Sequence, residues 1–406
     1  MSRRRFRIGP GALVAAAFVG PGTVTTCSLA GARAGTALLW ALTFSVIATL
    51  VLQEMSLRLG VVGGRDLAEA LREDFTSPVA GKLAGLLVLV AVGFGCAAFE
   101  TGNLLGAALG LESLWPASQR LLVFLLGMVA AVLLLIGSYK VLESILIGAV
   151  LLMSFAFLTT VAISGFKLVS VVRGALMPSL SGGGDIYLVI ALIGTTVVPY
   201  NLFLHASAVR ERFSGAGDLT AARTDAAVSI VLGGVISGAI VLTAAGAFYV
   251  PGEAGSTLRG AADMAAQLEP LLGRAATIFF SIGLLAAGLS SGITAPMAAA
   301  YATSGILGWE EGLRGSRQRA VALAVVATGV IFGTLGMRPV PAIMLAQAAN
   351  GILLPIVALF LLWVANDRRR LGVHSNGLAA NLLGVVVVVI AAGLGLWALL
   401  KLITST

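Results

Sequence analysis

The chain has 406 residues, of which 58% are hydrophobic and only 11% are charged, and its mean hydropathy is +1.02. This composition excludes an ordinary soluble domain, and the apolar runs are long enough to cross a bilayer. The formal net charge of +8 could indicate nucleic-acid binding, but the basic residues gather in loops that alternate to one side, which indicates orientation in a membrane instead. We therefore predict one polytopic domain over residues 1–406 that lies in a lipid bilayer and binds no nucleic acid.

Charges and clusters of Gly and Pro separate eleven apolar segments. Their cores are residues 11–33, 37–59, 82–108, 119–138, 142–165, 185–207, 226–250, 273–304, 318–335, 340–364 and 378–401. If the N-terminus is cytoplasmic, 18 of the 26 basic residues lie on the cytoplasmic side. This bias predicts eleven spans in a bacterial inner membrane, with the C-terminus outside. Cys27 and Cys96 lie in apolar segments, and we expect small packing residues rather than a disulfide or a metal pair.

The first segment is interrupted halfway by Gly20, Pro21, Gly22 and Thr23. Proline lacks a backbone donor and glycine admits non-helical dihedral angles, so we expect the helix to break here. Within a bilayer, the freed backbone groups are tolerated only where protein or a water-lined cavity receives them. The break is therefore a candidate binding site.

The sixth segment is also interrupted, by Gly194, Thr195, Thr196 and Pro199. The first and sixth segments each open a group of five spans, and the two groups have opposite orientations because five is odd. Paired broken helices at corresponding positions of inverted halves indicate a transporter with its site at the midplane. We predict an all-α fold with inverted repeats at about 8–170 and 180–365, followed by an extra helix at about 377–402.

Several stretches carry the motifs of a known transporter family. The runs GPG at 9–11 and GPGT at 20–23 lie where the family has its opening GPG and its DPGN motif. Residues 199–205, PYNLFLH, are similar to its P-H-N-x-x-L-H signature, and residues 283–294, GLLAAGLSSGIT, to its GLLAAGQSSTIT. The chain thus resembles the NRAMP family of divalent-metal transporters over nearly its whole length. The resemblance implies the fold of amino-acid:sodium symporters, with discontinuous first and sixth helices.

The departures from the family fall at its metal site. The resemblance places Gly20 and Thr23 at the family's metal-binding Asp and Asn. It places Val198 at the ligating Met, and Thr195 at the Ala whose carbonyl contributes. Because thioether and anionic donors are missing, we do not expect a metal site of the family's kind.

The family's proton path is altered as well. Tyr200 stands at the His that the resemblance links to proton movement. In the third span, an acidic pair with proton or gating duty appears as Glu100 and Asn103. An ionisable residue inside a span is expensive and usually functional, so Glu100 is expected either to serve this path or to pair structurally.

The remodelled pocket is predicted to offer neutral hydroxyls together with the N-terminal ends of broken helices, which favour anions. Thr25 and Thr26 have an alternative role, since threonines in spans often bond their own helix and only fill space. The predicted substrate-binding residues are Gly20, Pro21, Gly22, Thr23, Thr25, Thr26, Thr195, Thr196, Val198 and Tyr200. A small oxyanion such as bicarbonate fits this donor set.

Coupling is predicted to use sodium, which accepts hard neutral oxygens. Ser290 and Ser291 resemble the pair of hydroxyls that amino-acid:sodium symporters use, and the backbone around Gly20 and Thr23 would complete the site. Proton coupling and uncoupled transport remain open. Elsewhere, Glu54 and Glu143 lie near span ends and are expected to anchor to basic loop residues.

We thus expect a monomeric secondary active transporter that imports a small inorganic ion and holds no cofactor apart from the coupling ion. Sodium-coupled bicarbonate symport is the leading hypothesis. The alternative is an NRAMP-type transporter of magnesium or manganese, proton-coupled or uncoupled. A channel or sensor is less favoured, and an enzyme is disfavoured because no catalytic motif is present.

Overall fold

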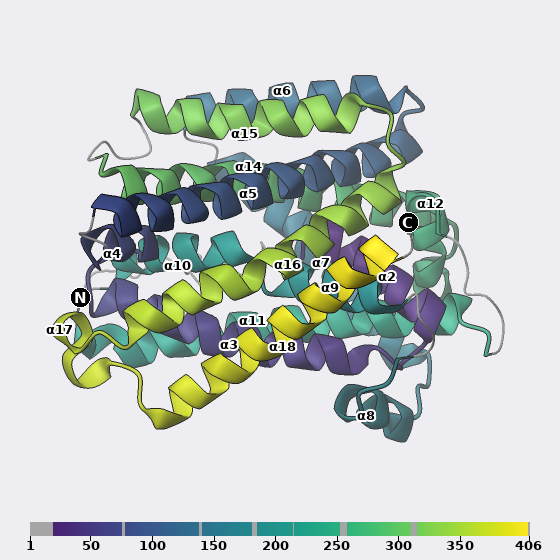
Figure 1. The fold of residues 1–406 in the computed structure, drawn as a ribbon. Helices are drawn as coiled ribbons and strands as arrows, with labels where there is room; N and C mark the ends of the chain where they lie inside the picture. The colour runs from purple at the N-terminus through teal and green to yellow at the C-terminus, as the bar shows by residue number, and fades with distance from the viewer. Residues whose placement is uncertain are drawn as a thin grey trace, which may run out of the picture.

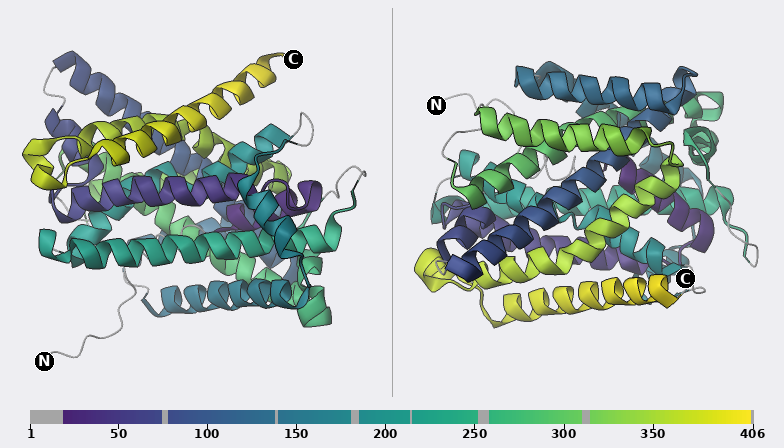
Figure 2. Two further views of the ribbon diagram at one scale, coloured as in Figure 1. Left: turned by 90° about the horizontal axis from the view of Figure 1, so that it is seen from below. Right: turned by 45° about the horizontal axis from the view of Figure 1, so that its top comes forward.

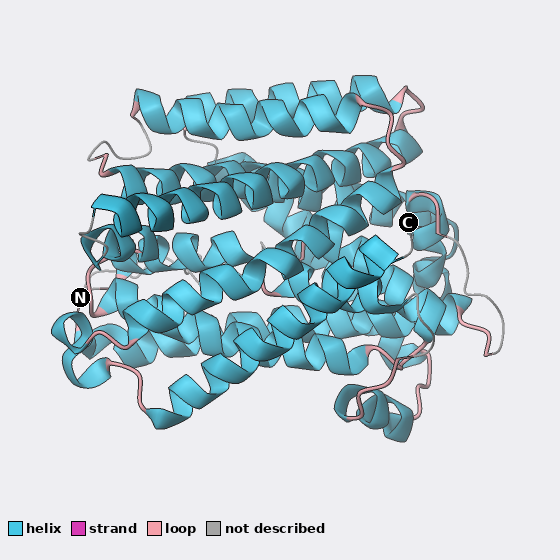
Figure 3. Cartoon of the chain, viewed as in Figure 1, coloured by secondary structure: helices cyan, strands magenta, loops and turns pink. Residues whose placement is uncertain are grey.

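The computed structural model describes residues 19–74, 78–137, 140–180, 185–213, 215–251, 258–309 and 315–404. Over these ranges the chain forms helices and contains no strand (Figure 3). Residues 11–18, which open the first apolar segment, lie outside the described residues. The longer helices are α2 (Pro21–Ala34), α3 (Leu39–Val61), α5 (Pro78–Leu114), α6 (Gln119–Ile136), α7 (Lys140–Ile163), α9 (Asp185–Thr196), α10 (Pro199–Arg212), α11 (Leu219–Phe248), α14 (Ala276–Leu307), α15 (Ser316–Thr334), α16 (Pro339–Ala365) and α18 (Leu378–Thr404).

Short helices connect the long ones at the two ends of the bundle. They are α4 (Leu67–Asp74), α8 (Leu168–Leu176), η1 (Ala216–Asp218), α12 (Ala261–Ala265), η2 (Ala266–Leu268), α13 (Glu269–Leu272), η3 (Gly273–Ala275), α17 (Arg368–Leu371) and η4 (Gly372–His374). Figure 1 shows α4 and α17 at one end, and α8 and α12 at the other. We call these the α4 end and the α12 end. The sequence predicts the α4 end to be cytoplasmic.

Nine apolar stretches in the described part of the chain are long enough to cross a membrane. The broken pair α9 and α10 forms one of them, from Ile186 to Arg210. Two expected spans are not among the nine: the first, which begins outside the described residues, and the ninth, which is α15. The all-helical membrane architecture is therefore confirmed, whereas the count of eleven stays a prediction.

The sixth segment forms the centre of the bundle. Its apolar stretch is 94% buried, compared with 28% for the stretches in α6 and α18. In both views of Figure 2, α18 lies at the edge of the bundle, where it packs on α16. The side chains that α18 exposes, including Leu382 and Val389, are apolar, as a lipid-facing surface requires.

Glycines let the helices around the sixth segment approach closely. A Cβ atom added to Gly106 of α5 would collide with Pro21 of α2, and one added to Gly288 of α14 would lie 2.7 Å from the backbone oxygen of Asn103. Small residues at such contacts are typical of helix packing in lipid. They bring α2, α5 and α14 together at the level where α2 begins.

Candidate functional site

The sixth segment is broken where the sequence predicts. Helix α9 ends at Thr196, Val198 is extended with φ −81° and ψ 117°, and α10 begins at Pro199. Helix α2 begins in the same way, after an extended Gly20 with φ −81° and ψ 174° and with Pro21 as its first residue. Proline fits a first helical position because its missing N–H has no helical partner there.

The two breaks are joined by their threonines. The hydroxyl oxygens of Thr23 and Thr195 lie 2.8 Å apart and share a hydrogen bond in which either can donate. Both side chains are buried. Two residues that the sequence assigns to one pocket, 172 positions apart, are therefore in direct contact.

Helix α16 closes the site with a residue that sequence reasoning missed. A Cβ atom on Gly22 would collide with the side-chain amide of Gln347, and one on Gly194 with the Gln347 backbone oxygen. The Gln347 Oε1 atom is buried and has no hydrogen-bond partner among the described residues. An amide within an apolar span is the signal that could have identified it. Asn350, three residues later, is also buried with both amide atoms unpartnered in that part of the chain.

The remaining threonines divide into two kinds. Thr196 donates to the Leu192 carbonyl of its own helix at 3.0 Å, and its part in substrate binding stays a prediction. Thr25 and Thr26 do the opposite. Their hydroxyls are buried and bond neither their own helix nor any other described residue, so the alternative role of bonding their own helix is wrong, while their part in substrate binding stays a prediction.

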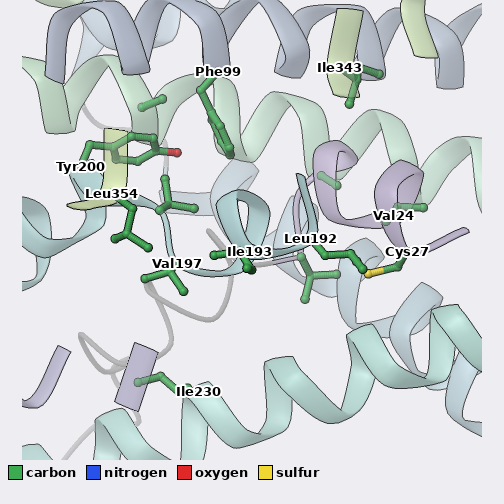
Figure 4. Packing of buried hydrophobic residues seen from close by; sticks show 14 of the residues in the cluster. Val24, Cys27, Phe99, Leu192, Ile193, Val197, Tyr200, Ile230, Ile343 and Leu354 are labelled. Carbon is green, nitrogen blue, oxygen red and sulfur yellow. The ribbon is translucent and has the colours of Figure 1, made fainter. Parts of the chain in front are cut away.

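Val198 and Tyr200 flank the start of α10. Val198 is buried and contributes an apolar side chain to the break. The Tyr200 ring packs edge-on against Phe99 of α5, with ring centroids 5.2 Å apart (Figure 4). The Tyr200 hydroxyl is buried and lacks a hydrogen-bond partner within the described ranges.

The altered acidic pair lies beside Tyr200. Glu100 is fully buried, and the Asn103 Nδ2 atom donates to its Oε2 atom at 3.5 Å, a long hydrogen bond. The Glu100 Oε1 atom and the Asn103 Oδ1 atom have no partner in the described chain. Structural pairing of Glu100 is thus limited to one weak contact.

The proposed sodium ligands are only partly brought together. Ser291 is buried and its hydroxyl bonds no described residue, whereas Ser290 is half-buried and its carbonyl accepts from Thr294. The Gly20 carbonyl accepts the Val24 N–H at 3.1 Å as part of the first turn of α2. A sodium site made from Gly20, Thr23, Ser290 and Ser291 therefore stays a prediction.

The donors at the breaks are hydroxyl and amide oxygens. Across the described ranges, no three His, Cys, Asp or Glu side chains form a group that could hold a metal ion. Cys27 and Cys96 are both buried free thiols. Any ion that binds at Thr23 and Thr195 consequently meets neutral oxygen atoms first.

Comparison with known proteins decides the family. Residues 11–401 match the model of natural resistance-associated macrophage protein-like sequences, Nramp. The chain belongs to the NRAMP family. It is 33% identical over 388 residues to a divalent metal cation transporter, MntH, of Ralstonia nicotianae, covering 91% of this chain and 85% of that relative.

Solved structures agree with NRAMP membership in their fold. A mutant of the Eremococcus coleocola manganese transporter superposes with a TM-score of 0.78 at 21% identity, covering 96% of this chain and 85% of that one. MhsT, solved in complex with L-phenylalanine, gives a TM-score of 0.64 at 16% identity and covers 97% and 98% of the two chains. The symporter-like fold expected from the sequence is confirmed.

NRAMP membership makes this chain an integral membrane transporter of a small ion rather than an enzyme. The relatives' names match the alternative of a divalent metal cation and lend no support to bicarbonate symport. The orientation of the termini and the monomeric state stay predictions.

Proposed function

We propose that this protein transports a hard divalent cation across the membrane, with magnesium as the preferred substrate and manganese as a weaker one. The observation that carries the proposal is the donor set at the breaks, which consists of Thr23, Thr195 and Gln347. All three offer neutral oxygen atoms. Relatives across the family bear the name of divalent metal cation transporter, which supports the charge and class of the substrate.

The donor chemistry favours magnesium over softer ions. Magnesium binds oxygen and loses its water reluctantly, so it is commonly held through several retained waters. Hydroxyl and amide oxygens are suitable partners for such waters. The resemblance to the family places Val198 at its methionine, so a thioether, which favours softer metals, is missing there. Manganese accepts oxygen donors too, but it loses the advantage that the thioether would give it.

Sodium-coupled bicarbonate symport is the second candidate, favoured by one observation. Both α2 and α10 begin at the breaks with a proline at the first position. The first-turn N–H groups of a helix have no helical partners, and the helix dipole adds partial positive charge there. Two such ends beside hydroxyls would suit an oxyanion.

Proteoliposomes that contain the purified protein test both candidates. Magnesium and manganese entry are followed with indicator dyes, and labelled bicarbonate entry is followed with and without a sodium gradient. We expect saturable magnesium entry, weaker manganese entry and no sodium-driven bicarbonate entry. The double variant Thr23→Val, Gln347→Leu should reduce magnesium entry by about tenfold or more, since it removes two oxygen donors.

The matched control is Thr160→Val, because Thr160 is buried but bonds the Ala156 carbonyl of its own helix. It should transport like the wild type. Sodium-dependent bicarbonate entry without divalent-cation entry would overturn the proposal in favour of the second candidate.

A further inference from the structure

Glu100 is a buried carboxylate without a basic partner. Its residue is 0% exposed, and none of the ion pairs in the described part of the chain includes it. A buried ionised carboxylate is costly unless a positive charge and hydrogen bonds compensate it. The single hydrogen bond from Asn103 is long, at 3.5 Å, and leaves Oε1 unpartnered.

Two glycines make room for this carboxylate between α14 and α15. A Cβ atom on Gly292 would lie 3.3 Å from Glu100 Oε1, and one on Gly329 would lie 2.7 Å from Glu100 Cγ. A larger residue at position 329 would therefore displace the Glu100 side chain. The absence of side chains at the two glycines leaves space for the carboxylate inside the bundle, where solvent does not reach it.

Unpartnered oxygen donors lie on the helices that pack around Glu100. The Asn103 Oδ1 atom and the Tyr200 hydroxyl have no hydrogen-bond partner among the described residues. The Tyr200 ring packs against Phe99, the residue before Glu100 in α5, with ring centroids 5.2 Å apart. Ser291, which precedes Gly292 in α14, adds a buried hydroxyl that is likewise unpartnered within those ranges.

We propose that Glu100, Asn103 and Tyr200 form a sodium site, with the Ser291 hydroxyl as a fourth oxygen donor. One carboxylate and one monovalent cation make a neutral pair, which is the least costly arrangement in a low-dielectric interior. A divalent cation would leave one positive charge uncompensated. The donors are hard oxygens, which suit sodium.

This site touches the helix that begins at the sixth-segment break. Tyr200 is the second residue of α10, and its ring contacts Phe99, the neighbour of Glu100 in α5. An ion bound at Glu100 would therefore affect the position of α10, and through α10 it would affect the substrate site. Sodium binding at Glu100 does not depend on which ion is the substrate.

Binding of radioactive sodium to the purified full-length chain tests the site, with potassium replacing sodium at constant ionic strength. Wild type should bind sodium saturably and in preference to potassium. Glu100→Gln should weaken binding by about a hundredfold or more, because it removes the charge. Tyr200→Phe should weaken it by about fivefold to tenfold, as expected for one neutral donor.

Ser281→Ala is the matched control, since Ser281 is also a buried α14 serine whose hydroxyl has no partner in the described chain. It should bind sodium like the wild type, whereas Ser291→Ala should bind more weakly. Sodium-dependent thermal stabilisation of the wild type, which should need about fivefold to tenfold more sodium in Tyr200→Phe, provides a second readout if Glu100→Gln does not fold. Equal binding of sodium and potassium by the wild type would overturn the proposal and leave Glu100 with a proton. Undiminished sodium binding in Glu100→Gln would overturn it as well.

Discussion

The hydroxyl groups of Thr23 and Thr195 meet across the two helix breaks at 2.8 Å. This contact joins the first turn of α2 to the last turn of α9. Under the proposed function, an ion that binds between them would exchange this bond for its own contacts. The threonine pair would then hold the two helices together without the ion and donate oxygen atoms to the ion when it binds.

The threonine pair should show energetic coupling. Thr23→Val and Thr195→Val each remove one partner of a buried hydrogen bond and should destabilise the protein by about 1–3 kcal/mol. The double variant should cost less than the sum by about 1 kcal/mol, because the shared bond is lost only once. Thermal unfolding in detergent measures the three shifts, with Thr160→Val as a control for the loss of a buried hydroxyl that bonds its own helix. Strictly additive shifts would argue against the bond.

Gly194 should tolerate no side chain. A Cβ atom there would collide with the backbone oxygen of Gln347 and lie 2.5 Å from the backbone nitrogen of Gly351, and backbone atoms cannot turn aside. Gly194→Ala should therefore destabilise the protein by about 2 kcal/mol or more and abolish transport. Gly148→Ala is the matched control in α7, because a Cβ atom there meets nothing within 4 Å. It should be neutral or slightly stabilising, since alanine favours a helix over glycine. Equal effects of the two substitutions would contradict the close packing of α9 on α16.

The sequence predicted the breaks because their cause is local. Pro21 and Pro199 remove backbone donors wherever the chain folds, and the neighbouring Gly20 and Val198 take extended backbone angles as a consequence. The symporter-like fold followed from the spacing of these breaks and from the family motifs. The substrate could not be predicted from the sequence, because the same hydroxyl donors suit both an anion and a hydrated cation.

Gln347 could not be identified from the sequence, because its role depends on packing between helices that are far apart along the chain. It becomes part of the site only when α16 folds against α2 and α9, through Gly22 and Gly194. Thr25 and Thr196 show the same limit on a smaller scale. Both are span threonines, yet only Thr196 bonds its own helix, and this choice depends on the neighbours each side chain meets.

Arg58 and Arg223 should respond differently to the same substitution. Both pair with Glu54, so its partners are basic as predicted, but they lie on α3 and α11 rather than in loops; the Glu143 side chain lies outside the described residues. The Arg58 side chain is 5% exposed and also donates to the His374 carbonyl and to Asn376, each at 2.6 Å, whereas the Arg223 side chain is 47% exposed.

Arg58→Lys should therefore cost about 2–3 kcal/mol of stability, because lysine cannot reproduce several directed hydrogen bonds in a buried position. Arg223→Lys should cost less than about 1 kcal/mol, as expected for a solvent-screened pair. Thermal unfolding of the two variants side by side makes the comparison. A larger loss of stability for Arg223→Lys than for Arg58→Lys would show that pairing with Glu54 matters more than the hydrogen bonds from Arg58 to the loop before α18.

Asp66 should make stability depend on pH. It lies between α3 and α4, outside the spans, where its Oδ1 accepts the Glu69 N–H at 2.8 Å and caps α4. Burial raises the pKa of Asp66 from 3.8 to about 6, and the charge of Glu69 adds to this; hydrogen bonding and Arg210 oppose it. The folded state therefore holds the proton more tightly than the unfolded state. Stability contributed by this proton is complete below pH 3.8, falls as pH rises towards 6 and is lost above that.

The difference of about two pKa units corresponds to about 3 kcal/mol across this window. Asp66→Asn keeps a good capping residue but cannot ionise, so it should match the wild type at pH 4 and be more stable at pH 7. Unfolding midpoints of both proteins, measured at intervals from pH 4 to pH 7, give the difference directly and cancel the contribution of other acids. Glu112→Gln, at an exposed position on α5, controls for the loss of an acidic group. A constant difference between wild type and Asp66→Asn over the whole range would mean that Asp66 stays ionised in the folded protein, and that its burial is compensated by Arg210.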